Sequence, residues 1–353
     1  MTRTSLPRLK DVAQEAKVSL SAASRILRGQ GDRYAEETRT RVFEASKKLG
    51  WRRNLLVDGM QTGRTKTIGV MIPPYDSYWV GVLDGIHATL SESKYLPITV
   101  WPSRWQELGA FEAQKEEGFE LISRLLDRRV DGLILWPAYA VAYREHFRDI
   151  AEKAVPVGVI DHTFTAGGLT DVVQTEDRQG AAEIAKYLLQ KGHRRIACLS
   201  TREIEAQTWA VRRRESFEAA IDRHRGAECR SWRLNTAGDN GLEVATELLS
   251  SEYCPTAVFC VSDHEAKFVY AAAESLELSI PSDISVAGFN DLDFAEWLRP
   301  SLTTMRLNPF AMGRLVAQMI LDRLSDESRE PSFVKVPADF VERDSVAAIP
   351  ERI

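Results

Sequence analysis

Hydrophobic residues near the amino-terminal end of the chain recur at helical spacing in two short segments separated by a tight break. The apolar positions are Val12, Ala13 and Ala16 in the first segment and Ala23, Ile26 and Leu27 in the second. The break spans residues 17–19. Ser19 is a favourable N-cap for the second segment, because its hydroxyl can accept a hydrogen bond from a free backbone N–H group. The pattern therefore predicts two short helices joined by a turn.

The second predicted helix carries polar and cationic residues opposite its apolar side. Ser21, Arg25 and Arg28 recur at i, i+4 and i+7, and Leu20 lies at the amino-terminal tip. A helix that enters the major groove of DNA needs an apolar back that packs on its scaffold and a polar front that reaches bases and phosphates. An ordinary surface helical hairpin with a solvated arginine face is the alternative interpretation.

A third helix is predicted over residues 36–49, with Val42, Ala45 and Leu49 facing inward. Gly50 ends this helix, and Trp51 is expected to cover the small core with its ring. The three segments together predict a small helical bundle at the start of the chain.

From Lys66 onward, short apolar runs alternate with amphipathic segments. The predicted strands are 67–72, 97–101, 130–136, 155–160, 195–200, 257–261 and 284–288, and the predicted helices are 79–91, 116–127, 180–190, 213–223 and 267–276. Strands separated by helices of this length form parallel sheets covered on both faces. The strands are too many for one compact sheet, so we expect two doubly wound subdomains with a cleft between them.

Charge is distributed unevenly along the 353 residues. The whole chain has a formal net charge of −5, but residues 1–66 hold 15 Lys/Arg and 7 Asp/Glu, a net of +8. Residues 67–353 hold 31 Lys/Arg and 44 Asp/Glu, a net of −13. A basic segment on an acidic body confines polyanion binding to that segment, which coincides with the helical bundle.

Residues 9–29, LKDVAQEAKVSLSAASRILRG, resemble the start of the LacI/GalR family of bacterial transcription regulators, which reads roughly LKDVAxxAGVSxxTVSRVLN. The matching positions are Leu9, Lys10, Asp11, Val12, Ala13, Ala16, Val18, Ser19, Ser24, Arg25 and Leu27. The later chain resembles the effector-binding core of the same family, which is like a periplasmic sugar-binding protein. The landmarks there are IGV (68–70), VDGLIL (130–135), residues 176–200, SD (262–263), ISVAGFND (284–291) and PSLTTMR (300–306).

The resemblance implies three parts: a helix-turn-helix domain, a hinge helix and an α/β core. Their expected bounds are 1–52, 53–66 and 67–353; within the core, the N-subdomain takes about 67–162 and 292–327 and the C-subdomain about 163–291 and 328–353. The chain is expected to cross between subdomains near residues 162, 292 and 328. A plain linker is the alternative interpretation of the hinge.

The resemblance also implies the residues that contact DNA. Leu20, Ser21 and Arg25 would read bases, and Ser19, Ser24, Arg28 and Thr38 would contact the backbone. In the hinge, which includes Asn54, Met60 would enter the central minor groove as an apolar wedge. Lys17 replaces the glycine usual in the turn, where a left-handed conformation is expected and costs a non-glycine residue roughly 1–2 kcal/mol.

A ligand is expected at the carboxyl ends of the core strands. The loops there combine aromatic rings with carboxylates and an amide, which suits a sugar because the ring C–H face stacks while the hydroxyls form hydrogen bonds. The expected ligand-binding residues at these positions are Tyr78, Trp79, Trp136, Asp161, Trp209, Asp263, Asn290 and Asp291. The family resemblance adds Arg213.

Motifs for catalysis are lacking. There is no GxGxxG after the first strand, no GxxxxGK[ST] and no GxSxG, and the histidines and the four cysteines lack metal-ligand spacing. We therefore expect no enzyme, cofactor or metal, and reduced thiols in a cytoplasmic protein. The expected function is a ligand-responsive regulator, a repressor of carbohydrate-utilisation genes that binds operator DNA and a sugar effector as a homodimer, without a membrane. A solute-binding protein of a transport system and a sugar-metabolising α/β enzyme are the alternatives.

Overall fold

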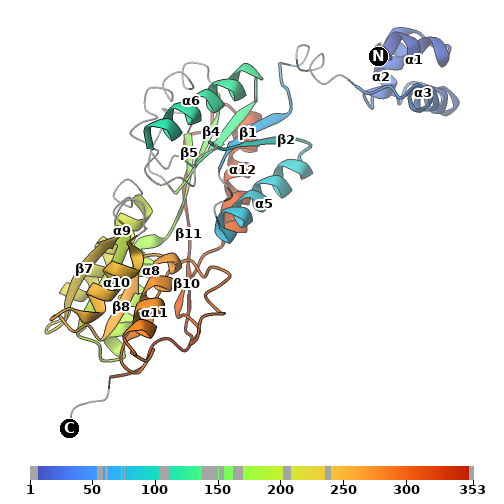
Figure 1. Cartoon of the computed structure of the whole chain (residues 1–353). Helices are drawn as coiled ribbons and strands as arrows, with labels where there is room; N and C mark the ends of the chain where they lie inside the picture. Colours follow the sequence, from blue (N-terminus) through green and yellow to red (C-terminus); the bar gives the residue numbers. More distant parts are fainter. Residues whose placement is uncertain are drawn as a thin grey trace. The chain divides into compact units, whose positions relative to one another are not determined.

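The computed structural model divides the chain into two compact units, Met1–Thr65 and Lys66–Ile353 (Figure 1). The structure describes residues 7–53, 59, 63–72, 74, 76–102, 111–136, 150, 155–161, 170–201, 208–234 and 240–349. The hinge residues Asn54 and Met60 lie outside the described residues, so their predicted roles stay predictions. No helix in the described ranges is long and apolar enough to cross a membrane.

The first unit is the predicted three-helix bundle of α1 (Leu9–Glu15), α2 (Leu20–Leu27) and α3 (Glu36–Leu49). Its buried core consists of Val12, Ala13, Ala16, Ala23, Ile26, Val42 and Ala45. Trp51 packs against this core, as predicted. Lys17 adopts φ 53°, which confirms the left-handed turn expected at this position.

The second unit contains two lobes. The first lobe holds a six-stranded parallel sheet in the order β11-β5-β4-β3-β1-β2. Its strands are β1 (Thr67–Met71), β2 (Leu96–Val100), β3 (Gly132–Leu135), β4 (Val157–Ile160), β5 (Thr170–Thr175) and β11 (Phe333–Val336), and its helices include α5 (Ser77–Glu92), α6 (Phe111–Asp127) and α12 (Pro309–Ser325). The alternation of side chains along these strands sends one set toward α5 and α12 and the other toward α6, so both faces of the sheet are covered.

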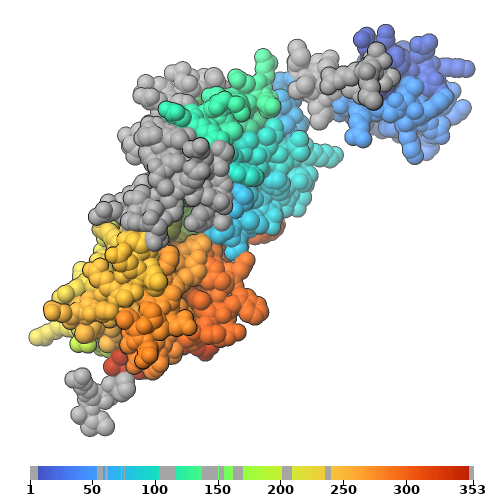
Figure 2. Space-filling model, in the orientation of Figure 1, coloured from blue at the N-terminus to red at the C-terminus, as the bar shows by residue number. Residues whose placement is uncertain are grey.

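Helices α5 and α12 pack very closely because glycines lie at their contact (Figure 1). A Cβ atom added at Gly85 would lie 2.2 Å from the Phe310 carbonyl oxygen, and one added at Gly313 would lie 2.0 Å from that of Val82. Neither backbone can move away cheaply, so only glycine fits at these two positions. This helix pair covers one face of the first-lobe sheet; Figure 2 shows the outer surface of α5 in cyan.

The second lobe holds a four-stranded parallel sheet in the order β7-β6-β8-β9 and a two-stranded antiparallel sheet. Its strands are β6 (Arg195–Thr201), β7 (Glu228–Leu234), β8 (Ala257–Cys260), β9 (Ser285–Ala287), β10 (Thr304–Arg306) and β12 (Asp339–Val341). Its helices are α8 (Asp177–Gln190), α9 (Thr208–Asp222), α10 (Gly241–Ser250) and α11 (Asp263–Ser275). Helix α8 packs on α9 and α10 packs on α11.

The predicted fold class is confirmed, but the predicted crossings near residues 162, 292 and 328 are wrong. Strand β5 bonds to β4 and β11 in the first-lobe sheet, so the first crossing follows Thr175. Strand β10 pairs with β12 in the second lobe, so the second crossing follows Arg306, and the third follows Val336. Helix α12, helix α10 and strands β5, β7, β10, β11 and β12 were not predicted.

Candidate functional site

Helix α2 has the two-sided character that the sequence predicts. The Ser19 hydroxyl accepts a hydrogen bond from the Ala22 amide at 3.1 Å and caps the helix. The apolar back, with Ala23 and Ile26, is buried in the bundle. The predicted DNA-contacting side chains are exposed at Ser19, Leu20, Ser21, Arg25 and Arg28 and half-buried at Ser24 and Thr38. The helix therefore offers a cationic and polar face that the bundle does not cover.

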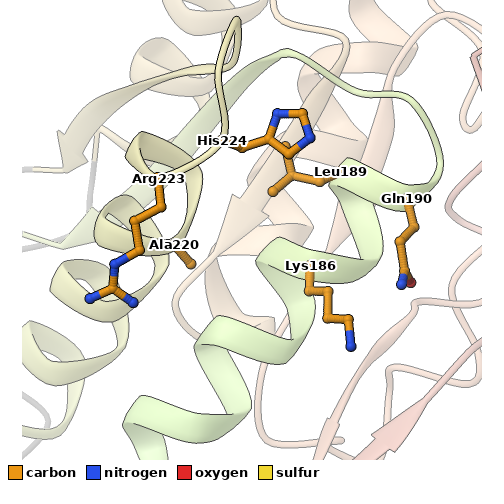
Figure 3. A pocket seen from close by; sticks show the side chains of 6 residues that line it. All are labelled: Lys186, Leu189, Gln190, Ala220, Arg223 and His224. Atoms are coloured by element: carbon orange, nitrogen blue, oxygen red, sulfur yellow. The ribbon is translucent and has the colours of Figure 1, made fainter.

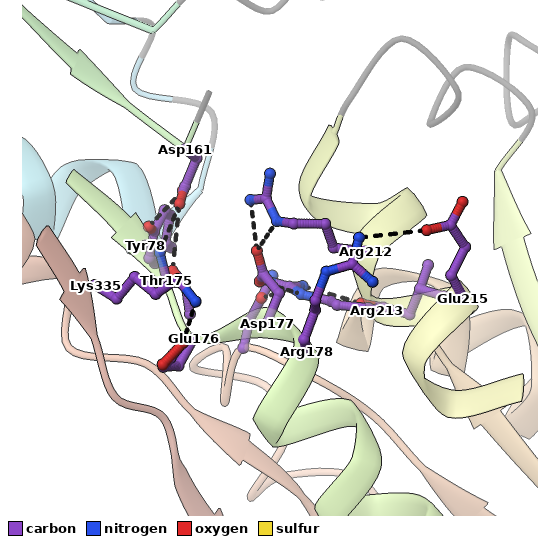
Figure 4. A network of polar contacts seen from close by, with 12 residues as sticks. Tyr78, Asp161, Thr175, Glu176, Asp177, Arg178, Arg212, Arg213, Glu215 and Lys335 are labelled. Atoms are coloured by element: carbon purple, nitrogen blue, oxygen red, sulfur yellow. Dashed lines mark hydrogen bonds and ion pairs between the residues drawn. The ribbon is translucent and has the colours of Figure 1, made fainter. Parts of the chain in front are cut away.

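Polar side chains near the strand ends form two clusters, one in each lobe (Figure 4). We call this group the strand-end site; it consists of Tyr78, Asp161, Thr175, Asp177, Arg212, Arg213 and Asn290. On the first-lobe side, the Tyr78 hydroxyl donates to Asp161 Oδ2 at 2.9 Å, and the Thr175 amide donates to Asp161 Oδ1 at 3.1 Å. All three side chains are buried.

On the second-lobe side, one carboxylate holds two guanidinium groups. Arg213 Nε donates to Asp177 Oδ1 at 2.8 Å, and Arg212 Nη2 donates to Asp177 Oδ2 at 2.7 Å (Figure 4). Asp177 is fully buried and opens helix α8, where the helix dipole favours a negative charge. The charge-assisted hydrogen bonds fix both arginines at the end of the second-lobe sheet.

Arg213 is also held by its own lobe on other sides. Its Nη1 donates to the Val261 carbonyl at 3.0 Å and to Asn290 Oδ1 at 2.8 Å. Its guanidinium carbon lies 3.8 Å from the centre of the Phe289 ring and 4.5 Å from that of Trp209. A planar cation clamped in this way is pre-organised for hydrogen bonding to a ligand.

Three of the nine non-glycine residues with positive φ in the described part of the chain lie at the same edge of the molecule. Asp161 has φ 56°, Asn290 has φ 120° and Asp291 has φ 56°, all in the region that disfavours non-glycine residues. Strain of this kind persists only where the surroundings hold it, and it concentrates at ligand-binding sites.

Burial shapes the acid–base chemistry of the first-lobe pair. Desolvation, followed by the nearby Asp177 carboxylate, raises the pKa of Asp161, and the hydrogen bond from Tyr78 opposes this rise. Desolvation, together with the Asp161 carboxylate, raises the pKa of Tyr78 well above its ordinary value. Tyr78 is therefore a neutral donor, and Asp161 is its acceptor.

Two family models match the chain. Residues 8–54 match the bacterial regulatory proteins of the lacI family, and residues 185–346 match the periplasmic binding protein-like domain. The chain belongs to the LacI family. This membership makes it a DNA-binding transcriptional regulator.

Curated relatives match this LacI-family chain along its whole length. The HTH-type transcriptional repressor PurR of Shigella dysenteriae serotype 1 (strain Sd197) is 28% identical over 351 residues, which cover 98% of each chain. PurR of Escherichia coli O1:K1 / APEC matches to the same extent. Both relatives are named as repressors.

Solved structures of LacI-type proteins share the fold. A LacI family regulator from Enterococcus faecium, solved with bound ribose, is 26% identical with a TM-score of 0.68 and covers 80% of this chain and 100% of its own. The lac repressor dimer bound to operator and the anti-inducer ONPF has a TM-score of 0.80 and covers 98% of this chain and 100% of its own. Its identity is only 20%, so this likeness concerns the fold.

The predicted aromatic residues divide between the lobes. Trp79 and Trp136 pack against each other with ring centres 4.5 Å apart, and Tyr78 meets Trp79 edge-on at 5.0 Å. Tyr78 and Trp79 are buried, whereas Trp136 and Trp209 are half-buried. The half-buried indoles are the better candidates for stacking on a ligand, because a buried ring has no face left to offer.

Two predicted ligand-binding residues, Asp263 and Asp291, also bond to other parts of the second lobe. Asp263 is fully buried, and its oxygens accept hydrogen bonds from the Leu292 amide at 2.8 Å and the Thr304 hydroxyl at 2.7 Å. Asp291 forms ion pairs with Arg306 at 2.7 Å and Arg343 at 2.6 Å. Their carboxylates hold the loop around residue 290 in place, and their predicted contact with a ligand stays a prediction.

Three residues of this region were missed: Asp177, Arg212 and His264. Asp177 lies two residues after the buried run at residues 170–175, which was the available signal. His264 Nε2 lies 3.0 Å from Asp76 Oδ2, which joins the start of α11 to the start of α5 and so links the two lobes. No sequence signal connects these residues, which are 188 positions apart.

A groove of about 470 Å³ lies elsewhere on the second lobe (Figure 3). It is lined by Lys186, Leu189, Gln190, Ala220, Arg223 and His224. These residues lie at the carboxyl ends of α8 and α9, the edge of the lobe at which its strands begin.

Proposed function

We propose that this LacI-family regulator is a ligand-responsive repressor of carbohydrate-utilisation genes. It acts as a homodimer on a near-palindromic operator, with a sugar bound between the two lobes. The observation that carries the proposal is the strand-end site itself. A clamped guanidinium, a buried tyrosine–aspartate pair and half-buried indoles meet in a chain that also has a lacI-type head.

The chemistry of the site fits a polyhydroxylated ligand. Asp161 and Asn290 can accept hydrogen bonds from hydroxyl groups, and Arg213 can donate to them. Trp136 and Trp209 can stack on the apolar face of a sugar ring. The solved Enterococcus faecium regulator, whose bound ligand is ribose, supports a sugar as the ligand class.

The DNA-binding proposal uses the exposed face of α2. Leu20, Ser21 and Arg25 would contact base edges in the major groove, while Ser19, Ser24, Arg28 and Thr38 would contact the backbone. Asn54 and Met60 would act from the hinge in the minor groove. The lac repressor, solved as a dimer on its operator, supports two heads on two half-sites.

Ligand and operator binding would be coupled through the arrangement of the lobes. A sugar that bonds Asp161 in the first lobe and Arg213 in the second stabilises one arrangement of the lobes over others. If that arrangement changes whether two hinge segments can pair, the sugar alters operator affinity, and the operator alters sugar affinity by the same factor.

The test selects duplexes from a random pool with the full chain and then measures affinities by fluorescence anisotropy. Arg25→Ala should reduce the preference for the selected duplex over random competitor by about tenfold or more, because direct base contacts carry selectivity of 1–3 kcal/mol. Arg41→Ala is the matched control: it removes the same charge from an exposed position on α3. Equal loss of preference in both variants would contradict the assignment of α2 as the reading helix.

A further inference from the structure

Three basic side chains line the groove between the ends of α8 and α9. Lys186 comes from α8, and Arg223 and His224 directly follow the last residue of α9 (Figure 3). All three residues are exposed. Among the residues that the structure describes, none of the three side chains forms an ion pair or a hydrogen bond. Their N–H donors are therefore available to a ligand.

The four arginines within the same two helices are each paired with a carboxylate. The pairs are Arg178–Glu215, Arg212–Asp177, Arg213–Asp177 and Arg214–Glu218, at 2.7–3.5 Å. At the groove, the acidic residues nearest along the helices are Glu183 and Asp222, and the described ranges contain no ion pair between either of them and a lining residue. Unpaired basic groups are thus a property of this end of the helix pair.

The helix dipoles account for only part of this arrangement. Two helix carboxyl ends together are equivalent to about one negative charge, since each carries about half a charge. Arg194 already complements α8, because its Nη1 donates to the Leu189 carbonyl at 2.9 Å. The side chains of Lys186, Arg223 and His224 donate to no carbonyl of the described helices. Their basic groups point to a further anionic partner.

The floor of the groove is apolar. Leu189 and Ala220 are half-buried, and both pack against the hydrophobic core of the second lobe. The volume of about 470 Å³ lies in the range of small-molecule sites, about 300–1,000 Å³. A ligand that fits both features has an anionic head and an apolar body.

We propose that this groove binds an organic phosphate as a second ligand of the chain. A phosphate monoester offers three free oxygens and a charge of about −1.5 to −2 at pH 7, which matches donors from Lys186, Arg223 and His224. Its carbon part lies on Leu189 and Ala220. The strands of the second lobe begin at this edge and end at the strand-end site, so the two sites are separate.

The test uses three probes on the full chain, by isothermal titration calorimetry. Phenyl phosphate carries both features, inorganic phosphate lacks the apolar body, and benzyl alcohol lacks the charge. We expect phenyl phosphate to bind, inorganic phosphate to bind at least about tenfold more weakly, and benzyl alcohol to show no saturable binding. Absence of saturable binding of phenyl phosphate at millimolar concentration overturns the proposal. Inorganic phosphate that binds as tightly as phenyl phosphate overturns it for an organic ligand.

A pair of variants locates the binding. Arg223→Gln should weaken phenyl phosphate by about tenfold or more, because a hydrogen bond between charged groups is lost. Arg225→Gln removes the same charge from an exposed position outside the groove lining, and the affinity should change by less than about twofold. Equal losses in the two variants would reveal diffuse surface attraction and overturn the proposal. If Arg213→Met abolishes the binding instead, the phosphate occupies the strand-end site and the proposal also fails.

Discussion

The second unit contains two buried arginine–aspartate pairs with the same hydrogen-bonding chemistry and different surroundings. Arg323 and Asp171 in the first lobe are both fully buried, and Nε and Nη2 of the arginine each donate to one carboxylate oxygen at 2.9 Å. Arg323 also donates to the carbonyls of Arg329 and Glu330, so it ties the segment between α12 and β11 to strand β5.

Arg213 and Asp177 are nearly as buried, but they lie at the strand ends among groups from both lobes. Asp177 is shared with Arg212, and Arg213 lies between two aromatic rings. The comparison teaches that burial of an ion pair does not reveal its role. Its position relative to the strand ends, and the groups that share it, distinguish the structural tie at Arg323 from the proposed ligand-binding group at Arg213.

The largest expected effect comes from breaking the structural pair. Arg323→Met leaves the Asp171 carboxylate buried without its cation, which should lower the free energy of unfolding of the second unit by about 3–5 kcal/mol. Urea denaturation followed by tryptophan fluorescence measures this loss. Arg329→Met is the control; its half-exposed ion pair with Asp322 should contribute less than about 1 kcal/mol. Similar losses in both variants would contradict the structural role of Arg323.

The second prediction removes the cation of the other pair. Arg213→Met leaves Asp177 paired with Arg212, so the stability loss should be smaller than for Arg323→Met, about 1–3 kcal/mol. Sugar affinity should fall by at least tenfold, since a charged donor to the ligand is lost, while operator affinity without sugar stays unchanged. Isothermal titration calorimetry measures the sugar affinity, and fluorescence anisotropy measures the operator affinity. A normal response to sugar would remove Arg213 from the site.

The third prediction concerns Glu265, a buried carboxyl group in the first turn of α11. Burial raises the pKa of Glu265 to about 7 from its ordinary 4.5, so the folded chain holds a proton that the unfolded chain releases between these values. The free energy of unfolding should therefore fall as pH rises from about 4.5 to 7. Asp263, whose pKa burial raises to about 6, adds a slope of the same sign.

Glu265→Gln should flatten that slope, and Glu215→Gln should keep it. Urea denaturation at a series of pH values from 4.5 to 8 provides the comparison. Parallel pH profiles for the unaltered chain and Glu265→Gln would contradict the buried position of this carboxyl group.

The smallest expected effect lies at the contact between His264 and Asp76. Asp76→Asn keeps the cap of α5, because asparagine caps helices as well as aspartate does. It should change sugar affinity by about two- to threefold, since partly exposed pairs contribute less than about 1 kcal/mol. A double-mutant cycle with His264→Gln measures the coupling. Strictly additive effects would show that the contact between the lobes plays no part in ligand binding.

Local patterns predicted the first unit almost completely, because its core residues and the Ser19 cap are set by spacing within a few positions. They also predicted the alternating strands and helices of the core. The crossings were misplaced because β5 and β11 belong to the first-lobe sheet through pairing with each other, about 160 residues apart. Such pairing leaves no local signal.

The candidate site was predictable in outline only. Position at a strand end correctly brought Tyr78 and Asp161 together, and the family resemblance supplied Arg213. The same criterion could not tell that Asp263 and Asp291 already bond to Thr304 and Arg306, since partners arrive from distant segments. For the same reason Asp177, the residue that holds Arg213, was overlooked.

The most direct measurement is the affinity of the full chain for its selected operator duplex, by anisotropy at one fixed salt concentration, with and without a saturating sugar. The sugar is one shown by calorimetry to bind. The account predicts that operator affinity changes by tenfold or more in the unaltered chain and changes less in Arg213→Met at the same sugar concentration. An operator affinity that stays the same while the sugar is bound would contradict the coupling between the two units.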